Sequence, residues 1–179
     1  MKWYHVEKNK GIYDWTRGDA ISDLFENWKI PLSGNTILWE VDQCKDCKRP
    51  NAAPEWFGNE FSSQLAAGED MSELKETVLE WVDTVVSRYA GRNQNWKVFN
   101  EPLHGDLYRA NFDNMWEDVI STIRMADPQA TITINDHDLV SSNQGSMVGK
   151  IALFAVIFMP TGKAAVHFKG KNVSMFIIV

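Results

Sequence analysis

Apolar residues recur at helical spacing in three segments of the chain. In residues 19–29 they form a single face, which consists of Ile21, Leu24, Phe25 and Trp28. Longer apolar stripes occupy residues 72–89 and 111–125. Residues suited to capping or ending a helix bound these segments, namely Asp19, Pro31, Ser72, Gly91 and Pro128. The pattern predicts three amphipathic helices.

Short apolar runs alternate with these helices along the chain. They cover residues 36–40, 96–99 and 131–134 and are predicted as strands. The order of helix, strand, helix, strand, helix, strand predicts an α/β fold with a parallel sheet and right-handed crossovers. The composition, 44% hydrophobic and 23% charged over 179 residues, fits a globular domain and not a disordered chain.

Each predicted strand ends in polar residues. Glu40 ends the first, Asn100 and Glu101 follow the second, and Asn135 and Asp136 follow the third. In α/β folds, active sites gather at the carboxyl ends of the strands. The three polar ends therefore predict a functional site at that edge of the sheet.

The stretch from residue 42 to about 67 is predicted as a long polar loop, and it contains Cys44 and Cys47. A structural zinc site normally needs a second pair of ligands, and the only nearby histidine is His5. We therefore predict no metal site, and the two cysteines are interpreted as a surface disulfide or as two free thiols.

The charge and the tryptophan content narrow the classes of partner. A net charge of −6 argues against nucleic acid and anionic membranes. The longest apolar run, residues 151–159, is about half a membrane span, and the first five residues lack the apolar core of a signal peptide. The eight Trp residues have two interpretations, an aromatic core or stacking on sugar rings.

Asn100 and Glu101 form a pair with a specific chemical use. Glycoside hydrolysis needs two carboxyl groups, one of which protonates the leaving oxygen while the other attacks or activates water. An Asn directly before the acid can bind the 2-hydroxyl of the sugar, and Pro102 would end the strand and keep Glu101 at its rim. The alternative interpretation of Glu101 is a surface residue in a turn.

The segment Trp96-x-x-x-Asn100-Glu101 resembles the acid/base motif of the family-10 glycoside hydrolases, the endo-β-1,4-xylanase family. Residues 1–3, 34–40 and 135–137 resemble further motifs of that family in the same order. The resemblance implies a partial (β/α)8 TIM barrel over residues 1–140, comprising about strands 2/3 to 5 with their helices. It also implies a polysaccharide substrate such as xylan or another β-1,4-glycan, a secreted protein, and no metal or organic cofactor.

The resemblance implies a role for each matching residue. Glu101 would be the catalytic acid/base, and the sugar would be bound by Lys2, Glu40, Asn100 and His137. Some positions depart from the family pattern: Ser33, Asn35 and Glu40 replace an Arg and two His, and His137 replaces a Tyr. The replacement at Asn35 puts the packing around the sugar in doubt.

Residues 141–179 match none of these motifs and contain no Asp or Glu. The nucleophile of the family is a Glu on the seventh barrel strand, so we expect a fragment with an unassigned tail that is inactive alone. We also expect poor solubility or oligomerisation, unless the tail covers an open edge of the sheet. Two alternatives are a catalytically dead carbohydrate-binding protein and a non-functional fragment.

Overall fold

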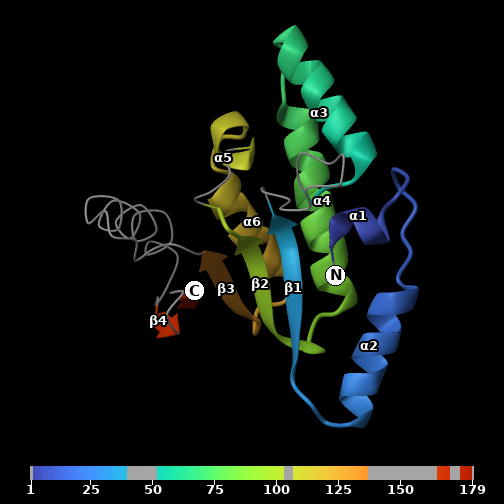
Figure 1. Ribbon diagram of the computed structural model, residues 1–179, viewed down its shortest axis with the longest axis vertical. Coiled ribbons are helices and arrows are strands. Elements are labelled where there is room, and N and C mark those ends of the chain that lie inside the picture. Colours follow the sequence, from blue (N-terminus) through green and yellow to red (C-terminus); the bar gives the residue numbers. More distant parts are fainter. Residues whose placement is uncertain (1, 40–51, 103–106, 137–164, 170–173, 179) are drawn as a thin grey trace.

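The structure is a computed structural model that describes residues 2–39, 52–102, 107–136, 165–169 and 174–178 (Figure 1). Its helices are α1 (Trp3–Val6), α2 (Thr16–Asn27), α3 (Glu55–Ala67), α4 (Ser72–Arg88), α5 (Leu107–Asn111) and α6 (Met115–Ala126). Its strands are β1 (Leu32–Trp39), β2 (Asn93–Asn100), β3 (Thr131–Asp136), β4 (Ala165–Lys169) and β5 (Ser174–Ile178). None of the helices in these ranges is both long and apolar enough to span a membrane.

The strands form a sheet in the order β1-β2-β3-β5-β4. Strands β1, β2 and β3 pair in parallel, which confirms the predicted α/β arrangement. Strand β5 pairs antiparallel with β3, and β4 pairs antiparallel with β5. Part of the C-terminal tail therefore covers the edge of β3, which is the exception that we made to the expectation of poor solubility or oligomerisation. Strand β1 lies at the opposite end of the sheet.

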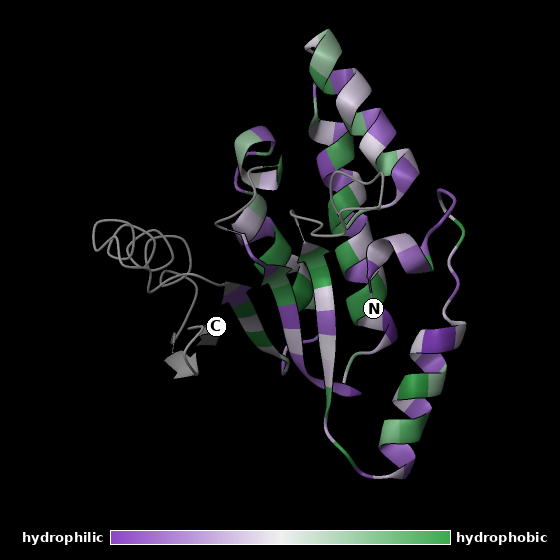
Figure 2. Ribbon diagram, viewed as in Figure 1, coloured by the Kyte–Doolittle hydropathy of each residue, from purple (hydrophilic) through white to green (hydrophobic). Residues whose placement is uncertain are grey.

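The core lies between the parallel strands and helices α4 and α6, which cover one face of them (Figure 1). Hydrophobic residues dominate the sides of these helices that meet the sheet (Figure 2). The predicted stripe of α4 is buried: Leu74, Val78, Trp81, Val82 and Val85. The Trp81 ring stacks on Trp3 at 5.6 Å and on Trp15 at 6.2 Å between ring centroids. These three indoles support the interpretation of an aromatic core.

Strand β1 approaches β2 closely at Gly34. A Cβ added there would collide with the ring of Trp96, a residue that is itself buried on β2. Only glycine leaves room for the indole at this position. The close contact fixes the lateral position of β1 relative to the strand that carries Glu101.

Two sequence predictions were wrong in detail. Residues 55–67 belong to helix α3 and not to a loop, because Phe57 and Phe61 lie one turn apart and are both buried. Gly68 ends this helix in a left-handed conformation with φ 67°. The helix predicted for residues 111–125 begins four residues later, as α6 at Met115, and Asn111 ends the preceding short helix α5. Asn114, with φ 52°, lies directly before α6.

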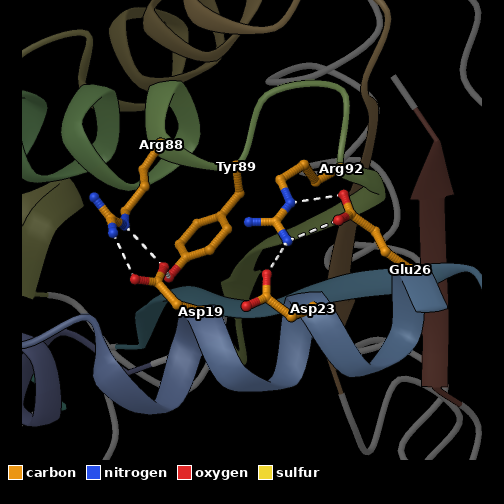
Figure 3. A network of polar contacts seen from close by, with 6 residues as sticks. All are labelled: Asp19, Asp23, Glu26, Arg88, Tyr89 and Arg92. Atoms are coloured by element: carbon orange, nitrogen blue, oxygen red, sulfur yellow. Dashed lines mark hydrogen bonds and ion pairs between the residues drawn. The ribbon is translucent and has the colours of Figure 1, made fainter.

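Helix α2 forms where it was predicted, but its apolar face is largely exposed. Ile21, Leu24 and Trp28 have exposed fractions of 49%, 41% and 64%. The helix is attached instead through its acidic side, where Asp19, Asp23 and Glu26 contact α4 and the residues that follow it (Figure 3).

Candidate active site

The carboxyl ends of the three parallel strands meet in register. Trp39 at the end of β1 lies opposite Asn100 of β2, and Asn100 lies opposite Asn135 of β3. The sheet therefore sets an indole and two amides side by side. This row is the edge at which the sequence predicted a functional site.

Glu101 follows directly after β2 and is fixed by both neighbouring strands. Its backbone N–H donates a 2.7 Å hydrogen bond to the carbonyl of Asn135. Its side-chain Oε2 accepts a 3.1 Å hydrogen bond from Nε1 of Trp39. The carboxylate is partly exposed, so it remains accessible to a ligand while its orientation is constrained.

Glu101 also has a backbone conformation that non-glycine residues seldom adopt, with φ 56°. Such a conformation costs on the order of 1 kcal/mol or more and persists only where surrounding contacts enforce it. Here the hydrogen bond to Asn135 and the pairing of β2 on both sides provide that constraint. Strain of this kind is concentrated at functional sites, which favours the catalytic interpretation over a plain surface turn.

Asn100 is held by its neighbour on β3. Its Oδ1 accepts a 2.9 Å hydrogen bond from Nδ2 of Asn135. Because this bond occupies the oxygen, the Nδ2 group of Asn100 is the end that can donate to a sugar hydroxyl. The amide pair therefore fixes the orientation of the Asn100 side chain at this edge, and its contact with a sugar stays a prediction.

Lys2 contacts the same edge through the ring of Trp39. Its Nζ lies 4.2 Å from the centroid of the Trp39 ring, within cation–π distance. The structure thus brings together three predicted site residues, Lys2, Asn100 and Glu101. Trp39 and Asn135 complete the group. Both lie at the ends of predicted strands, and this position is the sequence feature from which their place in the site could be predicted.

Two predicted site residues, Glu40 and His137, lie outside the described residues, so their roles remain predictions. The same holds for Cys44 and Cys47. Within the ranges that the structure describes, no three His, Cys, Asp or Glu side chains are grouped so that they could hold a metal ion.

The fold and site define an α/β protein with an acidic residue at the carboxyl end of a central parallel strand. Residues 1–154 match the sequence model of Glycosyl hydrolase family 10. Because this match covers most of the chain, the protein belongs to glycosyl hydrolase family 10.

Curated relatives of the chain include one xylanase from a plant and one from a fungus. Endo-1,4-beta-xylanase 5 of Arabidopsis thaliana is 26% identical over 146 residues, which are 79% of this chain and 22% of the relative. Endo-1,4-beta-xylanase 3 of Hypocrea jecorina is 27% identical over 156 residues, 83% of this chain and 40% of the relative. The chain therefore spans less than half the length of either protein.

Solved structures show the same fold. The chain superposes on the native xylanase 10B from Thermotoga maritima with a TM-score of 0.67 and 19% identity, over 89% of this chain and 46% of that one. A GH10 xylanase from Thermobacillus composti gives a TM-score of 0.60 and 20% identity, over 89% and 43% of the two chains.

Proposed function

We propose that this chain is the part of a retaining endo-β-1,4-xylanase barrel that carries the catalytic acid/base, Glu101. The observation that carries the proposal is the position of Glu101 at the carboxyl end of β2, oriented by Trp39 and by the backbone of Asn135. In barrel enzymes this end of the strands holds the active site. The three parallel strands and the family membership support a partial (β/α)8 barrel.

In the proposed reaction, the protonated carboxyl of Glu101 gives its proton to the glycosidic oxygen as the bond from that oxygen to the anomeric carbon breaks. A second carboxylate attacks the same carbon and forms a glycosyl-enzyme intermediate. The ionised Glu101 then removes a proton from the water that hydrolyses this intermediate. Nδ2 of Asn100 would donate to the 2-hydroxyl of the sugar, and Lys2 and Trp39 would contact the same ring or its neighbour.

Residues 141–179 cannot supply the second carboxylate, because they contain no Asp or Glu. A retaining enzyme needs its two carboxyl groups about 5–5.5 Å apart. We therefore propose that the isolated chain binds xylan or a related β-1,4-glycan but does not hydrolyse it. Secretion is proposed from the family resemblance alone.

Two measurements on the purified chain test this proposal. Titration with xylotetraose should show saturable binding that Asn100→Ala weakens about tenfold and that Asn95→Ala, a matched change five residues earlier on β2, leaves intact. Incubation with xylan should release no reducing sugar. Equal binding by the two variants would contradict the assignment of the site.

Release of reducing sugar that Glu101→Gln abolishes would contradict the proposed inactivity and support the acid/base role. In that case Glu40 and Asp136 become the candidates for the second carboxylate, because each ends a neighbouring strand in the sequence. Binding without turnover also fits the second candidate function, a carbohydrate-binding protein that lacks catalysis. The lack of any Asp or Glu in residues 141–179 favours that candidate over hydrolysis by the isolated chain.

A further inference from the structure

Four aromatic side chains form one continuous stack of nearly parallel rings, in the order Trp3, Trp81, Trp15, Tyr13. The planes of successive rings differ by 5°, 3° and 16°, and their centroids are 5.6, 6.2 and 5.5 Å apart. Trp81 comes from α4, whereas the other three come from α1 and from the segment between α1 and α2. Tertiary packing therefore assembles this aromatic stack from two distant parts of the chain.

The aromatic stack leads from the core to the surface. Trp3 and Trp81 are each 1% exposed, whereas Trp15 and Tyr13 are only partly buried. At the buried end, Nε1 of Trp81 donates a 3.2 Å hydrogen bond to the carbonyl of Ile37 on β1. The stack thus begins beside the strand that ends at the candidate site and finishes at a ring that water can reach.

Every ring of the aromatic stack belongs to a side chain that can lose an electron. Tryptophan and tyrosine are the aromatic residues that are oxidised most readily, whereas phenylalanine fills a core equally well but resists oxidation. An electron passes between two such rings when their π systems lie close together, because the transfer rate falls steeply with separation. A series of short steps is therefore much faster than one long step from the core to the surface.

The groups around the two ends of the aromatic stack favour movement of a positive charge outward. Nε1 of Trp3 donates a 2.6 Å hydrogen bond to the carboxylate of Glu7, which is 4% exposed. A carboxylate in such a poorly solvated place stabilises a positive charge on the indole. At the other end, burial and then the charges of Glu7 and Glu80 raise the pKa of Tyr13, so its phenol is protonated at neutral pH. Oxidation of Tyr13 must therefore release a proton, and this loss holds the radical there.

We propose that the aromatic stack conducts one-electron oxidation from the core beside β1 to Tyr13, and that it thereby protects the interior from radical damage. A radical oxidant that takes one electron from Trp3 or Trp81 leaves an indole radical cation. Single electrons then move inward along the stack, the last of them from Tyr13 to Trp15. Tyr13 gives its phenolic proton to water and becomes a neutral tyrosyl radical. A dissolved reductant such as ascorbate supplies a hydrogen atom and restores the phenol.

Two other aromatic rings contact the stack, but both meet it edge-on. Trp56 lies at 87° to Trp3, with centroids 5.9 Å apart, and Tyr89 lies at 71° to Trp15, with centroids 6.0 Å apart. Perpendicular rings overlap poorly, which slows electron transfer between them. The hydroxyl of Tyr89 donates to Asp19, whose lowered pKa makes it a poor acceptor of the proton. Neither ring therefore competes well with the stacked exit.

One cation lies beside the aromatic stack. The guanidinium of Arg88 is 5.0 Å from the centroid of the Trp15 ring and by itself would disfavour a positive charge there. Two hydrogen bonds join the same guanidinium to the carboxylate of Asp19, so the two charges balance. Trp15 therefore remains available as a step.

Pulse radiolysis of the full chain in azide solution tests the transfer, because azide radicals oxidise tryptophan in preference to tyrosine at neutral pH. All samples carry Trp28→Phe, since that indole is 64% exposed and would take up radicals outside the stack. The absorbance of indole radicals should decay while that of a tyrosyl radical rises, at a rate independent of protein concentration. Tyr13→Phe should remove most of the rise, whereas Tyr89→Phe, the matched control, should leave it intact. Trp15→Phe should abolish the rise, because it keeps an aromatic ring in place but interrupts the transfer.

Mass spectrometry of the same samples tests the buried half of the aromatic stack. Oxidation products on Trp3 should be scarce in the parent chain and should increase when Trp81→Phe separates Trp3 from the exit. Trp116→Phe is the matched control, because it changes a buried indole of α6 that does not belong to the stack. It should leave the amount of oxidised Trp3 unchanged.

Three results would overturn the inference. These are the absence of a tyrosyl signal, an equal loss of that signal in Tyr13→Phe and Tyr89→Phe, and an amount of oxidised Trp3 that Trp81→Phe does not change. Circular dichroism checks that each phenylalanine variant keeps the fold of its parent. The measurements contain no sugar, so a failure here is distinguishable from a failure of the proposed function.

Discussion

Helix α4 buries its apolar stripe against the parallel strands, whereas helix α2 turns its apolar side to solvent and is attached through its carboxylates (Figures 1 and 3). Both helices show the same type of periodic sequence pattern. The pattern predicts that a helix forms and which side is apolar. It does not predict that the rest of the chain provides a surface for that side.

The attachment of α2 consists of two neighbouring ionic groups, which Figure 3 shows together. Asp19 accepts hydrogen bonds from Nη2 of Arg88 at 2.6 Å and from the hydroxyl of Tyr89 at 2.9 Å. Arg92 contacts both Asp23 and Glu26, each at 2.7 Å. Burial, followed by the hydrogen bond to Asp19, raises the pKa of Tyr89 to about 12, so the hydroxyl remains a donor at neutral pH.

This difference has a consequence for stability. Burial of an apolar side chain contributes about 1.5–3 kcal/mol, whereas an exposed ion pair contributes about 0–1 kcal/mol. Helix α4 should therefore unfold only with the whole domain, while α2 should detach at a lower free energy. The following predictions test this ranking, starting with the largest expected effect.

Replacement of the buried indole of α4 should have the largest effect. Trp81→Ala removes a side chain that is 1% exposed, stacks on Trp3, and donates a 3.2 Å hydrogen bond to the carbonyl of Ile37. Large-to-small changes of this kind reduce the free energy of unfolding by about 3–5 kcal/mol. Urea unfolding followed by far-ultraviolet circular dichroism measures the loss. A loss below about 1 kcal/mol would contradict the assignment of α4 to the central core.

Loss of the ionic attachment should affect α2 alone. Arg92→Gln removes the contacts to Asp23 and Glu26 and should weaken the docking of α2 by about 1 kcal/mol, as expected for a partly exposed ion-pair network. Hydrogen exchange should become faster in residues 16–27 and remain unchanged in α4. Lys10→Gln is the matched control, because it removes an ion pair to Glu60 on α3. Equal effects of the two variants on α2 would contradict the prediction.

Acidification should release α2 through Asp19. The hydrogen bond from Arg88, followed by the one from Tyr89, holds the pKa of Asp19 below its usual value. A carboxyl whose pKa is lowered by folding stabilises the folded state above the pKa of the unfolded chain, about 4, and loses this contribution as the pH falls through the folded value. The protection of the α2 amides, taken relative to their intrinsic exchange rates at each pH, should therefore be independent of this group above pH ~4 and decrease below it.

Asp19→Asn provides the control for this pH dependence. The amide keeps the size of the side chain but does not titrate. The Asp19→Asn variant should therefore show weaker docking of α2 and a smaller change in the protection of α2 on acidification. The expected difference is below about 1 kcal/mol, because Asp19 is partly exposed. An unchanged acid response in the variant would assign the effect to other carboxylates, such as Asp23 and Glu26 on the same helix.

The sequence predicted the features that depend on local pattern. The periodic stripes located α2 and α4, and the polar residues at the strand ends located Asn100 and Glu101 at one edge with Asn135. The orienting contacts required the structure, because Trp39 and Glu101 are 62 positions apart and meet only through the register of β1 and β2.

Other features could not be predicted because they depend on tertiary packing. Helix α3 was interpreted as a loop, since the polar composition of its region concealed the short spacing of Phe57 and Phe61. The pairing of β5 with β3 joins residues more than 35 positions apart, and no local pattern specifies it. The exposure of the apolar face of α2 depends on how the helix is attached, and the ion pairs that attach it join residues about 65–70 positions apart.

Replacement of the exposed indole of α2 should have the smallest effect. Trp28 is 64% exposed, so Trp28→Ala should change the free energy of unfolding by no more than about 0.5 kcal/mol, the range of ordinary surface substitutions. The same substitution at Trp81 removes the same number of atoms, so a comparison of the two variants isolates burial from side-chain size. A loss of several kcal/mol at Trp28 would mean that another surface covers α2 in solution.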